Sequence, residues 1–258
     1  MATAAERGRG RSTIRAFASA VTGLLARIVQ TYKLGGRAMV AAPALVALVV
    51  VPEFAQHVAE IRLGMFDSID AARAYSQAPI RMAFGAVKLA GLFLAMLTIA
   101  RFWALGSVRR ALLPGRASFG RIAFALALFL GSGFALDRLA ESAPALWWPV
   151  TVANWITQSA LIVFLGAALF EDRRTGLRES VTTRLPTALV MTLLLVAAFA
   201  PAQTIHTLNH KLALGAPAAA VWAFMVWDSL VVGVLAALTG AALHVGYARG
   251  ATWRGWIG

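Results

Sequence analysis

The sequence predicts an all-α fold: a polytopic membrane helix bundle with six transmembrane helices and an N-terminal amphipathic interfacial helix. Three observations lead to this prediction. Of the 258 residues, 60% are hydrophobic and only 14% are charged, whereas soluble domains are about half apolar and a quarter charged. The apolar residues fall in long runs, without the alternation that is typical of half-buried strands. Basic residues collect in alternate connections between these runs, as the positive-inside rule requires.

The first 36 residues precede the expected membrane domain. Residues 1–13 are small, basic and polar, and we expect a disordered tail there. Over residues 14–36 apolar side chains recur every three or four positions, which predicts an amphipathic helix that ends at Gly35 and Gly36. Such a helix can lie in the headgroup layer with its cations on anionic lipid. The alternative is a helix packed on a neighbouring cytoplasmic segment.

Residues 37–248 carry six apolar runs, which predict the membrane domain. A helix needs roughly 20 apolar residues to cross a bilayer, and most of these runs reach that length. The expected spans cover about 38–57, 82–103, 119–137, 147–170, 185–204 and 218–247. Residues 249–258 then form a cytoplasmic tail.

The positions of the basic residues account for the net charge of +13. In the expected topology 18 Lys and Arg residues fall on one side of the membrane and 5 on the other. This split predicts that both termini are cytoplasmic. The heavy use of Ala and Arg suggests a bacterial genome, and the expected location is therefore a bacterial inner membrane. The expected partner is the lipid bilayer, with anionic headgroups at the basic face, and nucleic acid is not expected. A homo-oligomer or a membrane-protein partner is left open. Cys is absent, which excludes disulfides.

The stretch that follows the first apolar run is rich in ionisable groups. Glu53, His57 and Glu60 are spaced four and three apart, so they share one helical face. One imidazole and two carboxylates on one face can hold a divalent metal, and His57 alone can handle protons. We prefer the simpler interpretation, an interfacial helix whose polar face meets water and in which His57 pairs with a carboxylate. Asp67 or Ser68 then caps a short second helix.

Two further ionisable residues fall inside the expected spans, Lys88 in the second and Asp228 in the sixth. A lone charge at membrane depth is costly, and both lie in the outer half of their spans, so we expect them to form an ion pair. The alternative is that Lys88 reaches the interface while Asp228 bonds to Thr, Ser or Trp. Asn154 and Gln158 lie near the outer end of the fourth span, where such side chains join helices by hydrogen bonds.

His206 and His210 also have a spacing that suits a metal on a helix, but Pro201 and Gly215 bound their segment, so we expect a solvated loop. The remaining polar groups predict one outward-facing pocket between the first, second, fourth and sixth spans. Its expected members are Glu53, His57, Glu60, Lys88, Asn154, Gln158 and Asp228. We assign no catalytic residue and expect no cofactor. No metal is expected either, and the only metal candidates are the three residues spaced four and three apart.

The segment EFAQHVAE…GMFDS resembles one found in uncharacterised multi-pass inner-membrane proteins of alphaproteobacteria, over roughly residues 37–105. The resemblance implies a bacterial membrane protein and no particular activity. The alternation of basic amphipathic segments with spans is also similar, in architecture alone, to membrane domains attached to some glycerophosphodiester phosphodiesterases.

Three classes of function are compatible with these patterns. The first is a structural, interaction or envelope-assembly protein of the membrane, which we favour. The second is a transporter or channel that uses an outward-facing polar pocket. The third is an intramembrane enzyme that acts on lipid. The inner halves of the spans carry few polar groups, which argues against a transport path. An enzyme requires a metal or an acid–base pair, so the outer polar residues decide between the classes.

Overall fold

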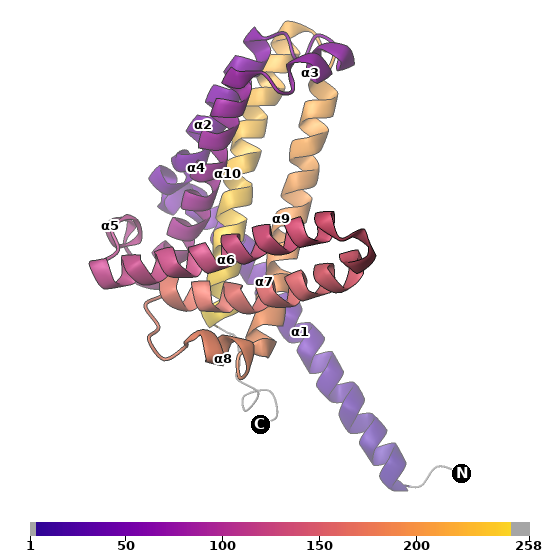
Figure 1. Cartoon of the computed structure of the whole chain (residues 1–258). Coiled ribbons are helices and arrows are strands. Elements are labelled where there is room, and N and C mark those ends of the chain that lie inside the picture. The colour runs from indigo at the N-terminus through magenta and orange to yellow at the C-terminus, as the bar shows by residue number, and fades with distance from the viewer. Residues whose placement is uncertain (1–3, 249–258) are drawn as a thin grey trace.

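The computed structural model describes residues 4–248 and is a bundle of α-helices (Figure 1). Within these residues, six helical segments are long and apolar enough to cross a membrane, which confirms the multi-pass all-α fold. They are α2 (Pro43–Arg62), α4 (Pro79–Leu105), α6 (Arg116–Ser142), α7 (Trp147–Leu169, after the short 3-10 helix η1, Pro144–Leu146), α9 (Leu185–Ala213) and α10 (Ala218–Ala248). Short helices α3 (Ile69–Tyr75), α5 (Val108–Leu112) and α8 (Leu177–Val181) lie in the connections.

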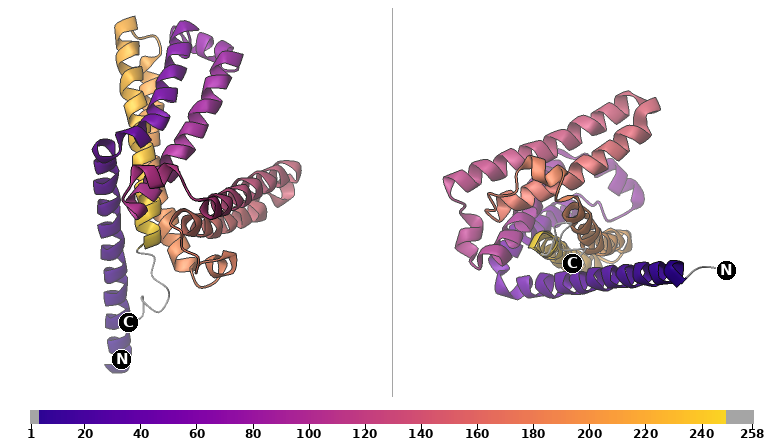
Figure 2. Two further views of the ribbon diagram at one scale, coloured as in Figure 1. Left: turned by 90° about the vertical axis from the view of Figure 1, so that its left-hand side faces the viewer. Right: turned by 90° about the horizontal axis from the view of Figure 1, so that it is seen from below.

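The N-terminal helix α1 (Ala4–Ala41) differs from the expected layout at both ends. It begins inside the segment for which we expected disorder, and its first turns project past the other helices (Figures 1 and 2). It continues through Gly35 and stops only at Ala42, because the residue before Pro43 is disfavoured in helical conformation. A Cβ atom at Gly35 would lie 2.5 Å from a side-chain carbon of Leu238, so this glycine permits close packing on α10 and does not end the helix.

Helix α10 runs through the centre of the bundle and packs against α1, α2, α4 and α9. Small residues allow these helices to approach closely, as is usual in membrane bundles. A Cβ atom at Gly233, Gly240 or Gly246 would come within 2.7 Å of atoms in α2, α4 and α9, respectively. The inner two thirds of α10 are therefore tightly enclosed, and most of their side chains are buried.

Helix α9 continues through Pro201, where we expected the span to give way to a loop soon afterwards. Pro201 has no backbone N–H, so the carbonyl of Ala197 loses its helical donor. The hydroxyl of Tyr32, on α1, donates a hydrogen bond to that carbonyl at 2.9 Å. Membrane helices tolerate proline where a neighbouring helix supplies the missing partner in this way. The extension of α9 to Ala213 carries its polar C-terminal turns alongside α10.

The hairpin of α6 and α7 lies across the other spanning helices and diverges from them towards its tip (Figures 1 and 2). Only the C-terminal half of α7 is buried against the bundle, and α6 exposes most of its length. The hairpin therefore separates its own polar residues from the outer ends of α2, α9 and α10.

Candidate functional site

The polar face of α2 points into the protein and not into water. Glu53 and His57 are 0% exposed and Glu60 is 1% exposed. These residues share one face, as their spacing predicts, but that face packs against α4 and α10, and the ring of His57 lies beside that of His210 on α9. The expectation that this polar face meets water is therefore wrong at these positions, whereas the expected pairing of His57 with a carboxylate is confirmed. The predicted cap of the next helix is also confirmed, because the Ser68 hydroxyl accepts a hydrogen bond from the third residue of α3.

Asp228 of α10 lies against this face and is fully buried. Its Oδ1 accepts a hydrogen bond from Asn209 Nδ2 at 2.8 Å, and its Oδ2 lies 2.6 Å from His206 Nδ1. His210 Nε2 lies 3.4 Å from the same Oδ2. These three partners lie within little more than one turn of α9, so the prediction of a solvated loop at His206 and His210 is wrong. The helix continued past Pro201 and turned one face of this segment towards Asp228.

Two cations on α4 approach the carboxylates of α2. Lys88 Nζ lies 3.2 Å from Glu53 Oε1, and Arg81 Nε donates to Glu60 Oε1 at 3.0 Å. Lys88 therefore pairs with Glu53 and not with Asp228, which corrects the ion pair expected from sequence. Lys88 and Asp228 nevertheless belong to the same cluster, by which we mean the polar side chains that meet between α2, α4, α9 and α10. The depths of the residues along their spans were predicted correctly, but the helix faces on which they lie assign them to different partners.

His57 lies among three carboxylates. Its Nδ1 is 3.2 Å from Glu60 Oε2, and its Nε2 is 3.2 Å from Glu53 Oε1 and 3.1 Å from Asp228 Oδ2. An ionised carboxylate accepts hydrogen bonds and cannot donate them. If a neutral His57 donates from Nδ1 to Glu60, its Nε2 lone pair faces two further acceptors. A proton or a metal ion at Nε2 removes that repulsion.

Four residues bring possible ligand atoms within 4.8 Å of one another: Glu53, His57, His210 and Asp228. A tetrahedral Zn²⁺ ion with bonds of about 2.0–2.1 Å holds its ligand atoms about 3.4 Å apart. The contacts of His57 Nε2 with Glu53 and Asp228, at 3.2 Å and 3.1 Å, and that of His210 with Asp228, at 3.4 Å, are close to this separation. Two of the possible ligand atoms, Glu53 Oε2 and His210 Nε2, are buried and make no hydrogen bond. His210 Nε2 is close to Asp228 Oδ2, but the contact is not a hydrogen bond.

Glu60 completes the arrangement from outside this group. Metal-ligating histidines usually donate their second ring N–H to a carboxylate, which fixes the orientation of the ring. Glu60 stands at Nδ1 of His57 in that position, and Arg81 and Gln56 hold it from the other side at 3.0 Å and 2.7 Å. The three metal candidates of the sequence therefore divide into two possible ligands and one orienting carboxylate.

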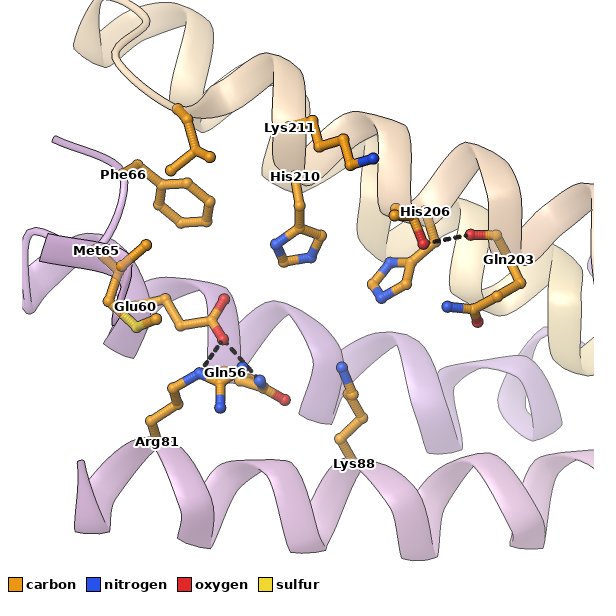
Figure 3. A pocket seen from close by; sticks show the side chains of 13 residues that line it. Gln56, Glu60, Met65, Phe66, Arg81, Lys88, Gln203, His206, His210 and Lys211 are labelled. Carbon is orange, nitrogen blue, oxygen red and sulfur yellow. Dashed lines mark hydrogen bonds and ion pairs between the residues drawn. The ribbon is translucent and has the colours of Figure 1, made fainter. Parts of the chain in front are cut away.

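A cavity of about 340 Å³ opens beside the cluster, between α2, α4 and α9 (Figure 3). Lys88 and Arg81 line it from α4, and His206, His210 and Lys211 line it from α9. Met65 and Phe66 add apolar surface at one end. The cavity gives a ligand direct access to His210, one of the four possible metal ligands.

Asn154 and Gln158 do not join this cavity. Asn154 Nδ2 donates to Asp137 on α6 at 2.9 Å, and Gln158 Nε2 donates to Ser132 and to the Phe129 carbonyl at 3.1 Å. They connect the two helices of the crosswise hairpin. Of the other five expected pocket members, Glu60 and Lys88 line the cavity, whereas Glu53, His57 and Asp228 are buried in the cluster beside it.

Sequence reasoning missed His206, His210 and Asn209 as members of the site. Their spacing of three and four residues places all three on one helical face, and this signal was available once Pro201 was accepted inside a helix. Arg81 and Gln56 were not singled out from sequence either, although both hold Glu60. No protein-family model, curated protein or solved structure matches this chain.

Proposed function

We propose that this chain is a metal-dependent membrane enzyme that binds a divalent transition-metal ion, of the Zn²⁺ type, at Glu53, His57, His210 and Asp228. One observation carries the proposal: donor atoms from three different helices converge within 4.8 Å of one another. Each of the three helices contributes at least one donor that is fully or largely buried. Convergence of this kind requires the folded bundle, so it does not follow from local helix composition.

The types of donor favour a reactive site over a purely structural one. Structural zinc sites are dominated by cysteine thiolates, whereas catalytic sites use histidine and carboxylate ligands and leave one coordination position for water or substrate. A catalytic ion here would therefore be held by three of the four residues, or by all four in a five-coordinate arrangement. This chain has no Cys, and its cluster combines imidazoles with carboxylates beside an open cavity. A metal ion in such surroundings supplies Lewis-acid chemistry and lowers the pKa of bound water. The residues around it would bind and orient the ligand.

For the membrane and the orientation we propose a bacterial inner membrane with both termini in the cytoplasm. The described ends of α1 and α10 point to the same end of the bundle, as an even number of spans requires (Figure 1). The loops rich in arginine, between α4 and α6 and between α7 and α9, carry the cations that the positive-inside rule assigns to the cytoplasm. In this orientation the cavity faces the outer side.

Transport is supported less well than enzymatic activity. The cluster lies in the outer half of the bundle, and Gly233, Gly240 and Gly246 bring α10 into close contact with its neighbours further inward. Thr98 and Thr239, in that inner region, direct their hydroxyls to carbonyls of their own helices. The geometry therefore favours a site that is reached from one side over a path across the membrane.

A structural role is the second candidate, and one observation favours it. The cluster residues already contact protein groups, with Lys88 on Glu53, Asn209 on Asp228 and Glu60 on His57. With His57 protonated, these contacts form a network that joins α2, α4, α9 and α10 without a metal. This is the envelope-structural class that we favoured from sequence, and the content of bound metal separates it from the enzyme.

The test is the metal content of the full chain, purified in a non-ionic detergent and measured by inductively coupled plasma mass spectrometry. We expect about one equivalent of a divalent transition metal after loading and dialysis. His57→Gln and His210→Gln should weaken binding by at least about tenfold, since even residues that only orient ligands contribute that much. His244→Gln is the matched control, because this partly buried histidine of α10 lies outside the cluster.

Bound metal should also raise the thermal stability of the wild-type chain by mass action, and chelation should reverse this. Wild-type protein that retains no metal after exposure to Zn²⁺, Mn²⁺ or Fe²⁺ contradicts the enzyme proposal and leaves the structural network. Equal metal contents in His57→Gln and His244→Gln also contradict it, because the ion then lies elsewhere.

A further inference from the structure

Three cationic side chains line the cavity beside the cluster, and none of them is a ligand of the proposed metal site. Arg81 and Lys88 stand on α4, and Lys211 stands on α9 across from them (Figure 3). Arg81 and Lys88 each hold a carboxylate of α2. Lys211 is exposed, and within residues 4–248 it makes no hydrogen bond or ion pair. One cation at the cavity thus remains available to a ligand.

The charges around the cavity determine what kind of ligand it takes. The cavity and the buried cluster beside it together contain three carboxylates and three cations, so these charges balance while the histidines are neutral. The carboxylates are Glu53, Glu60 and Asp228, and the cations are Arg81, Lys88 and Lys211. A divalent ion at the cluster adds two positive charges that no nearby residue offsets. The loaded site therefore favours a ligand with about two negative charges.

The size and walls of the cavity narrow the choice further. A volume of about 340 Å³ is at the small end for ligand pockets, and it suits a headgroup-sized ligand. The cavity lies between α4 and α9, two helices that are apolar enough to span the membrane. Met65, Phe66 and Leu214 add apolar surface to the lining. A polar anion joined to an apolar chain matches this combination.

We propose that this cavity binds a phosphate monoester, with the phosphate group between the metal site and Lys211. The inference rests on the proposed metal site. Lysine ammonium groups and divalent ions are usual partners of phosphate oxygens. The phosphate belongs either to the headgroup of a membrane lipid or to a soluble compound, and the experiment distinguishes these sources.

The test is isothermal titration calorimetry of metal-loaded chain in non-ionic detergent. The probes are inorganic phosphate, a short-chain phosphatidic acid and a short-chain phosphatidylcholine. We expect inorganic phosphate and phosphatidic acid both to bind. The zwitterionic phosphatidylcholine should bind at least about tenfold more weakly. Removal of the metal with a chelator should weaken binding of the anions by a similar factor. Phosphatidic acid that binds more tightly than inorganic phosphate identifies a lipid, and the reverse order identifies a soluble phosphate.

Lys211→Gln should weaken the binding of phosphate by about tenfold, the usual scale for hydrogen bonds to charged groups. Lys33→Gln, a matched change at an exposed lysine of α1, should leave it unchanged. Equal binding by Lys211→Gln and wild type, or by metal-loaded and metal-free chain, overturns the inference. If metal binds but no phosphate does, only this inference fails. If no metal binds, the proposed function fails and the inference fails with it.

Discussion

Two aspartates differ in the groups that surround them: Asp172, which contacts the C-terminal end of α10, and Asp228, which lies in the N-terminal half of α10. Asp172, in the loop after α7, accepts hydrogen bonds from the Tyr247 hydroxyl at 2.5 Å, the Thr175 hydroxyl at 2.9 Å and the Arg174 backbone N–H at 2.9 Å. Arg184 adds an ion pair at 3.5 Å. Every neighbour of Asp172 in this set is a donor, and one is a backbone group that is fixed in place. This aspartate fastens the α7–α8 loop to the end of α10.

Asp228 sits among groups of both kinds. Asn209 donates to it, but the other contacts come from histidines whose ring nitrogens either donate or accept. Glu53 reaches the same imidazole nitrogen of His57 as Asp228 does. A carboxylate that is surrounded only by hydrogen-bond donors needs no further partner. Two carboxylates that converge on one imidazole nitrogen, in contrast, require a cation. The comparison therefore separates a structural fastening from a candidate binding site.

The largest expected effect is at Asp228. In the metal-loaded chain, Asp228→Asn should lower the free energy of unfolding by about 3–5 kcal/mol, the usual cost of breaking a buried charged contact. Unfolding in mixed detergent micelles, followed by circular dichroism, measures this. After chelation the loss should shrink, because the neutral amide then relieves repulsion among the remaining acceptors.

The matched change Asp70→Asn, at a side chain that is 94% exposed, should alter stability by less than about 0.5 kcal/mol. An Asp228→Asn loss that is the same with and without metal speaks against a cation in the cluster. The site would then resemble that of Asp172, with a fixed set of protein partners.

A smaller effect distinguishes the two possible partners of Lys88. Lys88→Met and Glu53→Gln should be coupled by about 1–3 kcal/mol in a double-mutant cycle, because the two side chains are in contact at 3.2 Å. Lys88→Met and Asp228→Asn should show weaker coupling, since no direct contact joins them. Charge reversal at Lys88 and Asp228 together should not restore stability. Stronger coupling to Asp228 than to Glu53 contradicts the observed pairing.

The sequence predicted the levels of the polar residues along their helices well. The spacing of Glu53, His57 and Glu60 placed them on one face, and the hydropathy pattern placed Lys88 and Asp228 at a similar depth. Both predictions follow from helix geometry alone. The sequence could not predict the direction in which each helical face points. A polar stripe on an apolar helix faces water or a polar interior, and only the packing of α9 and α10 decides between them.

The residues that were misplaced share another cause. Asn154 and Gln158 have the right depth in their span, but the hairpin of α6 and α7 turns away from the cluster. His206 and His210 were excluded because Pro201 indicated the end of a helix. The donor supplied by Tyr32 from α1 compensates for that proline. Both errors concern contacts between helices that are distant in sequence, which a periodic pattern in one helix does not contain.

The smallest expected effect tests the other side of the comparison, at Asp172. Burial raises the pKa of its carboxyl group, but the hydrogen bonds from Tyr247, Arg174 and Thr175, with the charge of Arg184, outweigh burial and hold the pKa below its usual range. A carboxyl group whose pKa is lower in the folded chain stabilises the fold at every pH above its unfolded pKa of about 3.9. That contribution is lost as the pH falls through the lower, folded pKa.

Asp172→Asn should therefore cost about 1 kcal/mol at pH 7, a modest value because the aspartate side chain is 24% exposed. The difference from wild type should begin to decline below about pH 4, where the carboxyl group of the unfolded chain takes up a proton, and it should disappear once the pH falls below the lower pKa of the folded chain. Measuring the difference at each pH cancels the titration of groups that both chains share. Chelation should leave the difference unchanged, in contrast to Asp228→Asn, because donors alone surround Asp172. A chelation-dependent loss at Asp172 would show that the two aspartates are linked through the bundle and do not act as separate structural and binding groups.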